Sequence, residues 1–378
     1  MVKSSPIPVD HPGSFIAEEL EARGWLQADL AYILGMDAGQ LNKLIGGKAD
    51  INPDLAMALG EAFDMPPEFF LNLQKMYDLH RARKADPGVR ARATWLSAFP
   101  VREMIKRGWI EDAEPGLLDL QMLRFFEKDR VEDIPFVGNA NIMAHVAKKS
   151  DYEQTTAIQY VWLTRVRKIA EQMECPLYSE GALRSGLAGI RSHMMEKEDF
   201  GRVAHILMKC GVRFVLVEAL PGSKIDGVCV WLDGQPVIGM TLRLDRADNF
   251  CFVLRHEIEH VLNHDGMEAS FSPVDELDTE PSSEVALCEK LANDAAAEFC
   301  VPQALLSSFI LRKSPFISER DVLAFAARVE INPAIVIGQI HRKTKKFTFL
   351  RKYLTSIREH LLDWPYRDGW GIQAPTDL

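Results

Sequence analysis

The pentapeptide His-Glu-Ile-Glu-His at residues 256–260 constrains this chain more than any other short segment. Residues 250–255 before it are apolar except for Arg255 and contain neither Gly nor Pro, so a helix is expected from about 248 to 264. Residues four apart share one face of a helix, so His256 and His260 can hold one zinc ion. Glu257 beside them can take a proton from water that the ion activates. The pattern indicates a metal-dependent hydrolase rather than two ordinary surface histidines.

A third protein ligand is needed, because two histidines leave a tetrahedral zinc site incomplete. Residues 284–299 are rich in helix-forming residues and Pro302 follows as a stop signal, so a second helix is expected there. Glu289 on this helix completes a His/His/Glu set. Asn293 lies one turn further on the same face and can hydrogen-bond a ligating imidazole.

Three other residues compete for the place of the third ligand. Glu284 is the nearest competitor of Glu289, and Glu298 is a more distant one. His264 is left out of the metal set, because eight residues of helix separate it from His256 by about 12 Å.

Three short runs that precede the metal-binding helix are rich in β-branched and aromatic residues. They are residues 212–218, 228–232 and 236–242, and Pro-Gly and Asp-Gly turn signals separate them. They predict a small antiparallel sheet. Its role is either to pack against the helix or also to offer an edge strand with which a peptide substrate pairs.

Residues from about 200 to 302 resemble the ImmA/IrrE group of zinc metallopeptidase domains. In that group an HExxH helix precedes a second helix of approximate pattern ExxAN-x-FAxxLLxP, and here that helix begins Glu-Lys-Leu-Ala-Asn at residue 289 and reaches Pro302. The resemblance implies a gluzincin-like fold that holds Zn²⁺. Two positions differ from the pattern, since Leu291 stands where members often carry Glu, and Ala295 where they carry Phe. The site residues that the resemblance implies are the ligands His256, His260 and Glu289, the catalytic Glu257, and the supporting Asn293.

The N-terminal sequence carries a different signal. Residues 26–37 and 38–48 are two short amphipathic stretches hinged at Gly35, and Asp37 is placed to cap the second. Similar stretches flank them at 14–23 and 54–63. Four or five short helices in this arrangement predict a helix-turn-helix domain.

Residues 8–84 resemble the Cro and lambda-repressor-like class of the XRE type, and more closely the HigA-type antitoxins, whose tail is similar to residues 67–78. The resemblance implies binding to operator DNA as a homodimer. Ala38 and Gly39 occupy positions where repressors present longer side chains, so few groups remain for reading bases. The residues implied in DNA contact are Gln27 and Lys48 at phosphates, and Gln40, Asn42 and Lys43 at base edges.

Charge gives only partial support to DNA binding. Residues 1–95 hold ten Lys/Arg against thirteen Asp/Glu, whereas residues 75–107 hold nine basic and three acidic groups. The basic stretch either flanks DNA phosphates or is a solvated helix face. A fold of this kind also serves for protein docking or dimerisation.

Composition limits the number of domains, the mode of nucleic-acid binding and the cellular location. The chain has 378 residues, enough for two or three domains, and its net charge of −10 excludes general coating of nucleic acid. Six cysteines without a CxxC pair favour a reducing cytoplasm. Neither a signal peptide nor a membrane-spanning apolar run is visible, so we expect a cytoplasmic protein with no membrane association.

We therefore expect a mainly α protein with a small α+β domain. Its predicted parts are a helix-turn-helix domain at 8–84, a helical connector at 85–195, a gluzincin-like zinc domain at 196–305 and a C-terminal helical extension at 306–378. The acidic loop at 272–283 is either a mobile lid or a plain solvated loop. The expected function is an antitoxin-like DNA-binding regulator whose peptidase domain cleaves a regulatory protein. The alternative is primarily an active zinc endopeptidase, which its helix-turn-helix domain targets to a repressor or toxin partner.

Overall fold

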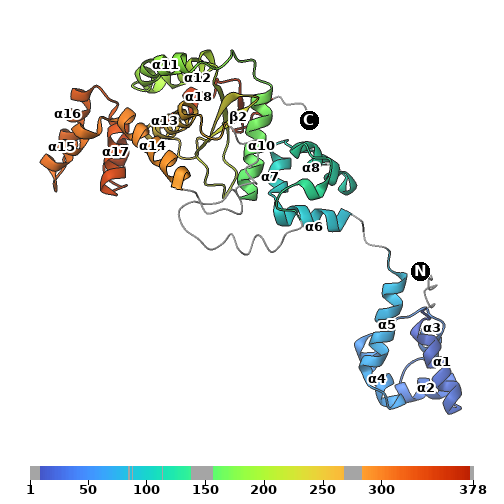
Figure 1. Cartoon of the computed structure of the whole chain (residues 1–378). Helices are drawn as coiled ribbons and strands as arrows, with labels where there is room; N and C mark the ends of the chain where they lie inside the picture. Colours follow the sequence, from blue (N-terminus) through green and yellow to red (C-terminus); the bar gives the residue numbers. More distant parts are fainter. Residues whose placement is uncertain are drawn as a thin grey trace. The chain divides into compact units, whose positions relative to one another are not determined.

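A computed structural model of the chain describes residues 9–83, 86, 88–112, 114–137, 156–267 and 283–374, with side chains except at 115 and 283–286. The chain divides into two compact units, Met1–Asp86 and Pro87–Leu378, called here the N-terminal and C-terminal units. Figure 1 draws the helices and strands of both units, and each unit has its own apolar core. Residues 272–282 of the predicted acidic loop fall outside this description.

The N-terminal unit is a small helical bundle with the predicted helix-turn-helix arrangement. Gly35, with a φ of 62°, ends α2 in the left-handed conformation. The Asp37 carboxylate then accepts the backbone N–H of Gly39 at 2.8 Å and of Gln40 at 3.2 Å, so it caps α3 as the sequence predicts. The helices are α1 (Pro12–Arg23), α2 (Gln27–Leu34), α3 (Ala38–Ile45), α4 (Pro53–Phe63) and α5 (Pro67–Arg81).

One face of α3 fixes this helix in the bundle. Leu41 and Leu44 are buried and join a core that also contains Leu30, Phe63 and Phe70. Residues on the opposite face of α3 stay exposed. The bundle therefore presents the outer face of α3 on a rigid support.

The C-terminal unit begins with helices that pack into the same core as the rest of the unit. The α10 helix is the most deeply buried of them, and even its Arg165 and Thr164 are covered. These first elements are α6 (Gly88–Ala98), α7 (Val101–Lys106), η1 (Pro115–Leu117), α8 (Leu118–Phe126), η2 (Val131–Asp133), α10 (Ala157–Glu171), α11 (Glu180–His193), η3 (Lys197–Asp199) and α12 (Phe200–Lys209).

The sheet is mixed, so the prediction of an antiparallel sheet was wrong. Its strands are β1 (Arg213–Val217), β2 (Gly227–Leu232), β3 (Gln235–Met240) and β4 (Arg367–Asp368), in the order β2-β3-β1-β4. Only β2 and β3 pair antiparallel, because the tight turn at Asp233-Gly234 joins them directly. β3 inserts next to β1 and runs parallel to it, as does β4 on the other side.

Helices cover both faces of this sheet. Gly239 of β3 faces Val166 of α10, whereas Gly227 of β2 faces Val253 of α13 (Ala247–Asn263). The α10 and α13 helices therefore lie on opposite faces, as Figure 1 shows. The remaining elements are α14 (Ser283–Cys300), α15 (Gln303–Lys313), α16 (Glu319–Val329), α17 (Pro333–Thr344), η4 (Arg351–Tyr353) and α18 (Arg358–Leu361).

A buried ion pair joins the first helices of the unit to its last strand. The Asp368 carboxylate accepts hydrogen bonds from the Arg165 guanidinium and, at 2.8 Å, from the Trp109 indole. Arg165 and Asp368 are almost fully buried, so each charge depends on the other. Residues 306–378 thus supply a strand as well as helices.

Among the described residues, we find no single helix that combines the length and apolar character needed to cross a membrane. Two strongly bent helix pairs meet the criterion by length and composition alone, Leu287–Cys300 with Gln303–Lys313 and Glu319–Val329 with Pro333–Thr344.

Candidate metal centre

The α13 helix forms where the sequence predicts it and carries both histidines on one face. Its apolar residues, including Leu254, Ile258 and Val261, are buried against the sheet and neighbouring helices. The helix ends at His264, which adopts the left-handed conformation with a φ of 57°. This reversal turns the chain back towards the histidines.

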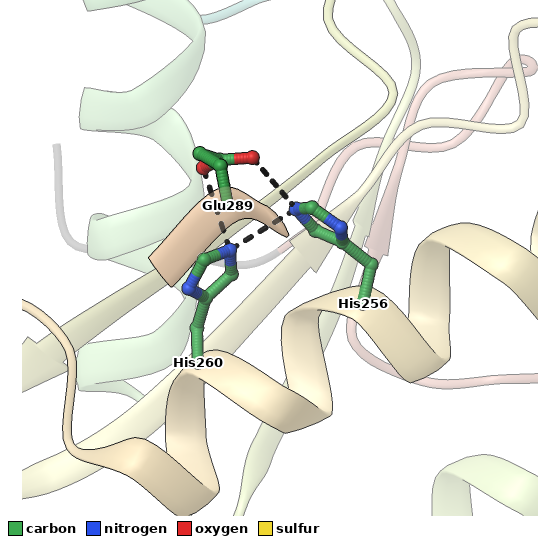
Figure 2. Close-up of side chains that lie close together, drawn as sticks. All are labelled: His256, His260 and Glu289. Carbon is green, nitrogen blue, oxygen red and sulfur yellow. Dashed lines mark hydrogen bonds and ion pairs between the residues drawn. The ribbon is translucent and has the colours of Figure 1, made fainter. Parts of the chain in front are cut away.

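His256, His260 and Glu289 meet in one cluster between α13 and α14. The two Nε2 atoms lie 3.0 Å apart, and the Glu289 carboxylate oxygens lie 3.4 Å from His256 and 3.5 Å from His260 (Figure 2). Their candidate ligand atoms all fall within 4.8 Å of one another. Two imidazoles and a carboxylate are the donor set of many catalytic zinc sites, so these residues fit a metal ion.

Hydrogen bonding and opposite charge hold the imidazoles and the Glu289 carboxylate together. Burial alone lowers the pKa of His256, but the hydrogen bond to Glu289 and the charges of Glu257 and Glu289 raise it above its ordinary value. The same hydrogen bond and the two imidazoles lower the pKa of Glu289 against the effect of burial. The carboxylate is therefore held ionised next to the imidazoles, as metal binding requires.

Glu257 is buried beside the cluster. It is only 7% exposed, and burial raises its pKa to about 7 against the opposing charges of His256 and His260. The missing side chain at Gly227 makes room for it, since a Cβ there would lie 2.8 Å from Glu257 Oε1 and 2.6 Å from Val253. Such a pKa suits a group that accepts and returns a proton near neutral pH.

Asp265 supports His260 and is a residue that the sequence reasoning missed. Its carboxylate lies 2.8 Å from His260 Nδ1, which leaves Nε2 to face the cluster. The Trp231 indole donates a 3.0 Å hydrogen bond to the Asp265 carbonyl oxygen. The only signal in the sequence is the closeness of Asp265 to the end of the helix, because the reversal at His264 is what brings it back.

The other predicted site residues of this unit lie as follows. Asn293 is exposed on α14 and contributes to the raised pKa of His256. Glu298 accepts the backbone N–H of Gln303 at 2.9 Å and stands outside the cluster. His264 stacks on Trp231 with ring centres 5.5 Å apart. The side chain of Glu284 falls outside the described residues.

The predicted DNA-contacting residues all lie exposed on the N-terminal unit. Gln27 is the first residue of α2, and Lys48 follows α3 in the next turn. The predicted base-reading residues Gln40, Asn42 and Lys43 belong to α3 itself. These side chains are therefore available to a ligand.

Comparisons with known proteins cover the N-terminal region. An uncharacterized HTH-type transcriptional regulator of Haemophilus influenzae is 35% identical over 68 residues, 18% of this chain and 64% of that protein. This chain therefore spans less than two thirds of the length of that relative. No family model matches the chain.

Solved structures match over a similar share of the chain. An addiction module antidote protein of a HigA family from Coxiella burnetii is 34% identical, with 19% of this chain and 80% of that chain covered and a TM-score of 0.19. A Pseudomonas aeruginosa protein in complex with its operator DNA is 33% identical, with 21% and 87% covered and a TM-score of 0.20. Over the 68 residues aligned with the Haemophilus influenzae protein, the N-terminal part of this chain resembles an HTH-type transcriptional regulator.

Proposed function

We propose that the chain is a DNA-binding transcription regulator with an antitoxin-like N-terminal unit and a zinc-dependent peptidase site of ImmA/IrrE type in its C-terminal unit. The observation that carries the enzymatic part is the meeting of His256, His260 and Glu289 next to the buried Glu257. The substrate of such a site is a regulatory protein.

The three clustered residues would hold the zinc ion. A zinc ion there supplies a Lewis acid that makes water a nucleophile at neutral pH. Asp265 orients the His260 ring, and Asn293 supports His256 from α14.

Glu257 is proposed to move the proton. Its carboxylate accepts a proton from the attacking water and later delivers it to the amine that leaves the cleaved peptide bond. Burial favours this role, because it keeps the carboxylate out of bulk solvent next to the residues that would hold the ion. The scissile bond is in a peptide, since the family resemblance and the edge position of β2 both suit an extended chain.

The N-terminal unit is proposed to bind operator DNA as a homodimer. The likeness to an HTH-type transcriptional regulator and the exposed polar groups of α3 support this role. Gln27 and Lys48 supply phosphate contacts, and Lys43 reaches a base edge. Gln40 and Asn42 offer the amides that pair with adenine edges.

A second function is supported by the same residues. The chain is then primarily an active zinc endopeptidase, and the helix-turn-helix unit delivers it to a repressor or toxin partner. Operator binding that survives Glu257→Gln favours the regulator, whereas a phenotype lost entirely in Glu257→Gln favours the endopeptidase.

The first experiment is elemental analysis of the dialysed full chain beside His260→Ala and Glu257→Gln. We expect about one zinc per chain in the wild type and in Glu257→Gln, and none in His260→Ala. The zinc-loaded proteins are then incubated with a peptide library, and cleavage should occur with the wild type alone. A wild type that binds no zinc when zinc is offered would falsify the enzymatic proposal.

A further inference from the structure

The row of rings along α13 extends beyond the two histidines. Phe252, His256 and His260 are spaced by four residues and share one face of the helix. The Phe252 and His256 rings are stacked with centres 6.5 Å apart, and the two imidazole centres are 4.7 Å apart. Phe252 therefore marks one end of a row that leads directly to the metal ligands.

Arg342 of α17 covers this end of the row. Its guanidinium carbon lies 3.4 Å from the centre of the Phe252 ring, a close cation–π contact. Adding the stacking distance places this cation within about 10 Å of the His256 ring. Arg342 is exposed, whereas Phe252 beneath it is buried. The residue as a whole reaches solvent, but partial burial of its guanidinium lowers the pKa of Arg342 from its ordinary value.

Arg342 lacks an anionic partner in the part of the chain that the structure describes. The nearby carboxylates that act on its charge are Asp248 and Asp226. Both already pair with other arginines, Asp248 with Arg246 at 2.9 and 2.5 Å, and Asp226 with Arg243 at 3.1 and 2.9 Å. A positive charge therefore remains uncompensated at this end of the ring row.

The position of β2 tells which half of a bound peptide would reach Arg342. Among the described strands β2 is at the sheet edge, and Gly227, its first residue, touches Glu257. A peptide that pairs antiparallel with β2 places its C-terminal half beside the start of this strand. Asp226, which immediately precedes β2, is also the residue that links this end electrostatically to Arg342.

We propose that Arg342 is a substrate-specificity residue that binds a carboxylate on the C-terminal side of the scissile bond. Because an extended chain advances about 3.3 Å per residue, 10 Å corresponds to the first three residues on that side. The preferred substrates are peptides with Asp or Glu there. This inference rests on the proposed peptidase function.

The test uses the zinc-loaded full chain and does not depend on finding a natural substrate. The probes are tripeptide amides with a hydroxamate head, in which the hydroxamate takes the metal and Glu or Gln stands at each position in turn. Dissociation constants are measured by calorimetry for the wild type, Arg342→Ala, Arg342→Lys and Arg328→Ala. Arg328 is a matched control, since it is also an exposed arginine over a phenylalanine, Phe325, at 5.3 Å.

We expect the wild type and Arg328→Ala to bind one Glu probe about tenfold tighter than its Gln counterpart, as a charge-assisted contact provides. Arg342→Ala should lose this ratio while its affinity for the Gln probe stays unchanged, and Arg342→Lys should keep part of it. Two outcomes overturn the role of Arg342 but leave the peptidase proposal standing. They are zinc-dependent binding with equal affinity for the Glu and Gln probes, and an affinity ratio that survives Arg342→Ala. A zinc-loaded chain that binds none of the probes overturns the peptidase proposal, and the role of Arg342 falls with it.

Discussion

The two units place their candidate functional residues by opposite means. In the N-terminal unit, residues 27–48 carry all the predicted DNA contacts, and local features such as the Asp37 cap hold them in place. In the C-terminal unit, the ligand set is complete only when α14 packs against α13, and Asp265 and Gly227 come from other segments. Substitutions on the first surface should therefore change binding alone, whereas substitutions at the metal centre should change chemistry and folding together.

We expect the two units to unfold independently of each other. Leu41→Ala removes a fully buried side chain from the core behind α3 and should destabilise the N-terminal unit by about 2 to 5 kcal/mol. Zinc content of the C-terminal unit should not change. Urea unfolding followed by circular dichroism, beside elemental analysis, measures both. The converse control is Ile258→Ala, which should affect only the C-terminal unit, and loss of zinc in Leu41→Ala would show that the units are coupled.

The buried Glu257 carboxylate should lower the free energy of unfolding at pH values where it is ionised. Its folded pKa of about 7 exceeds its usual value of 4.5, so the metal-free fold loses stability as the pH rises between these values. Glu257→Gln should therefore be more stable than the wild type by about 3 kcal/mol at pH 8.5, and the gain should shrink towards pH 5.

Urea unfolding of chelator-treated protein at the two pH values measures this effect. Glu259→Gln is the control, because Glu259 lies on the same helix but pairs with Arg255 at 2.6 Å. It should not stabilise the fold. An equal gain from Glu257→Gln at both pH values would show that ionisation is not its origin.

Asp265 offers a way to weaken the site without removing a ligand. Asp265→Asn keeps the shape but removes the negative charge that faces His260 Nδ1 at 2.8 Å. Zinc affinity should fall by about 10 to 100-fold. Competition with a chromophoric chelator gives the dissociation constant, and the exposed Asp294→Asn on α14 serves as control. An unchanged affinity would mean that Asp265 only closes the turn.

The smallest effect is expected at the cap of α3. Asp37→Ala removes the carboxylate that accepts two backbone N–H groups, and should destabilise the N-terminal unit by about 1 kcal/mol. The loss in free energy of operator binding should be no larger than this loss of stability. Thermal unfolding and a fluorescence titration with operator DNA measure the two quantities. Asp37→Asn should retain most of the stability, because an amide oxygen also caps helices.

Local signals account for what could be predicted from the sequence. The spacing of His256 and His260 predicts their shared face, the Asp-Gly pair predicts the β2–β3 hairpin, and Asp37 predicts the start of α3. The parallel pairing of β1 with β3 could not be predicted, because it depends on which strand inserts between which.

The same limit applies within the candidate site. Glu289 stood out because helix spacing and a family pattern both mark it, but nothing local marks Gly227, Asp265 or Arg342. Gly227 matters only because Glu257 packs over it, and Arg342 because α17 brings it onto Phe252. These roles arise from packing between segments that are distant in sequence. No short sequence motif marks such contacts.

The buried Arg165–Asp368 pair also has a consequence for synthesis on the ribosome. Arg165 needs a carboxylate that lies 203 residues later in the chain, so the C-terminal unit cannot complete its core until β4 has emerged. The N-terminal unit is complete about 280 residues earlier, which corresponds to about 15 to 60 s of translation. During that interval the nascent chain already carries a finished helix-turn-helix unit while the metal centre is still being made.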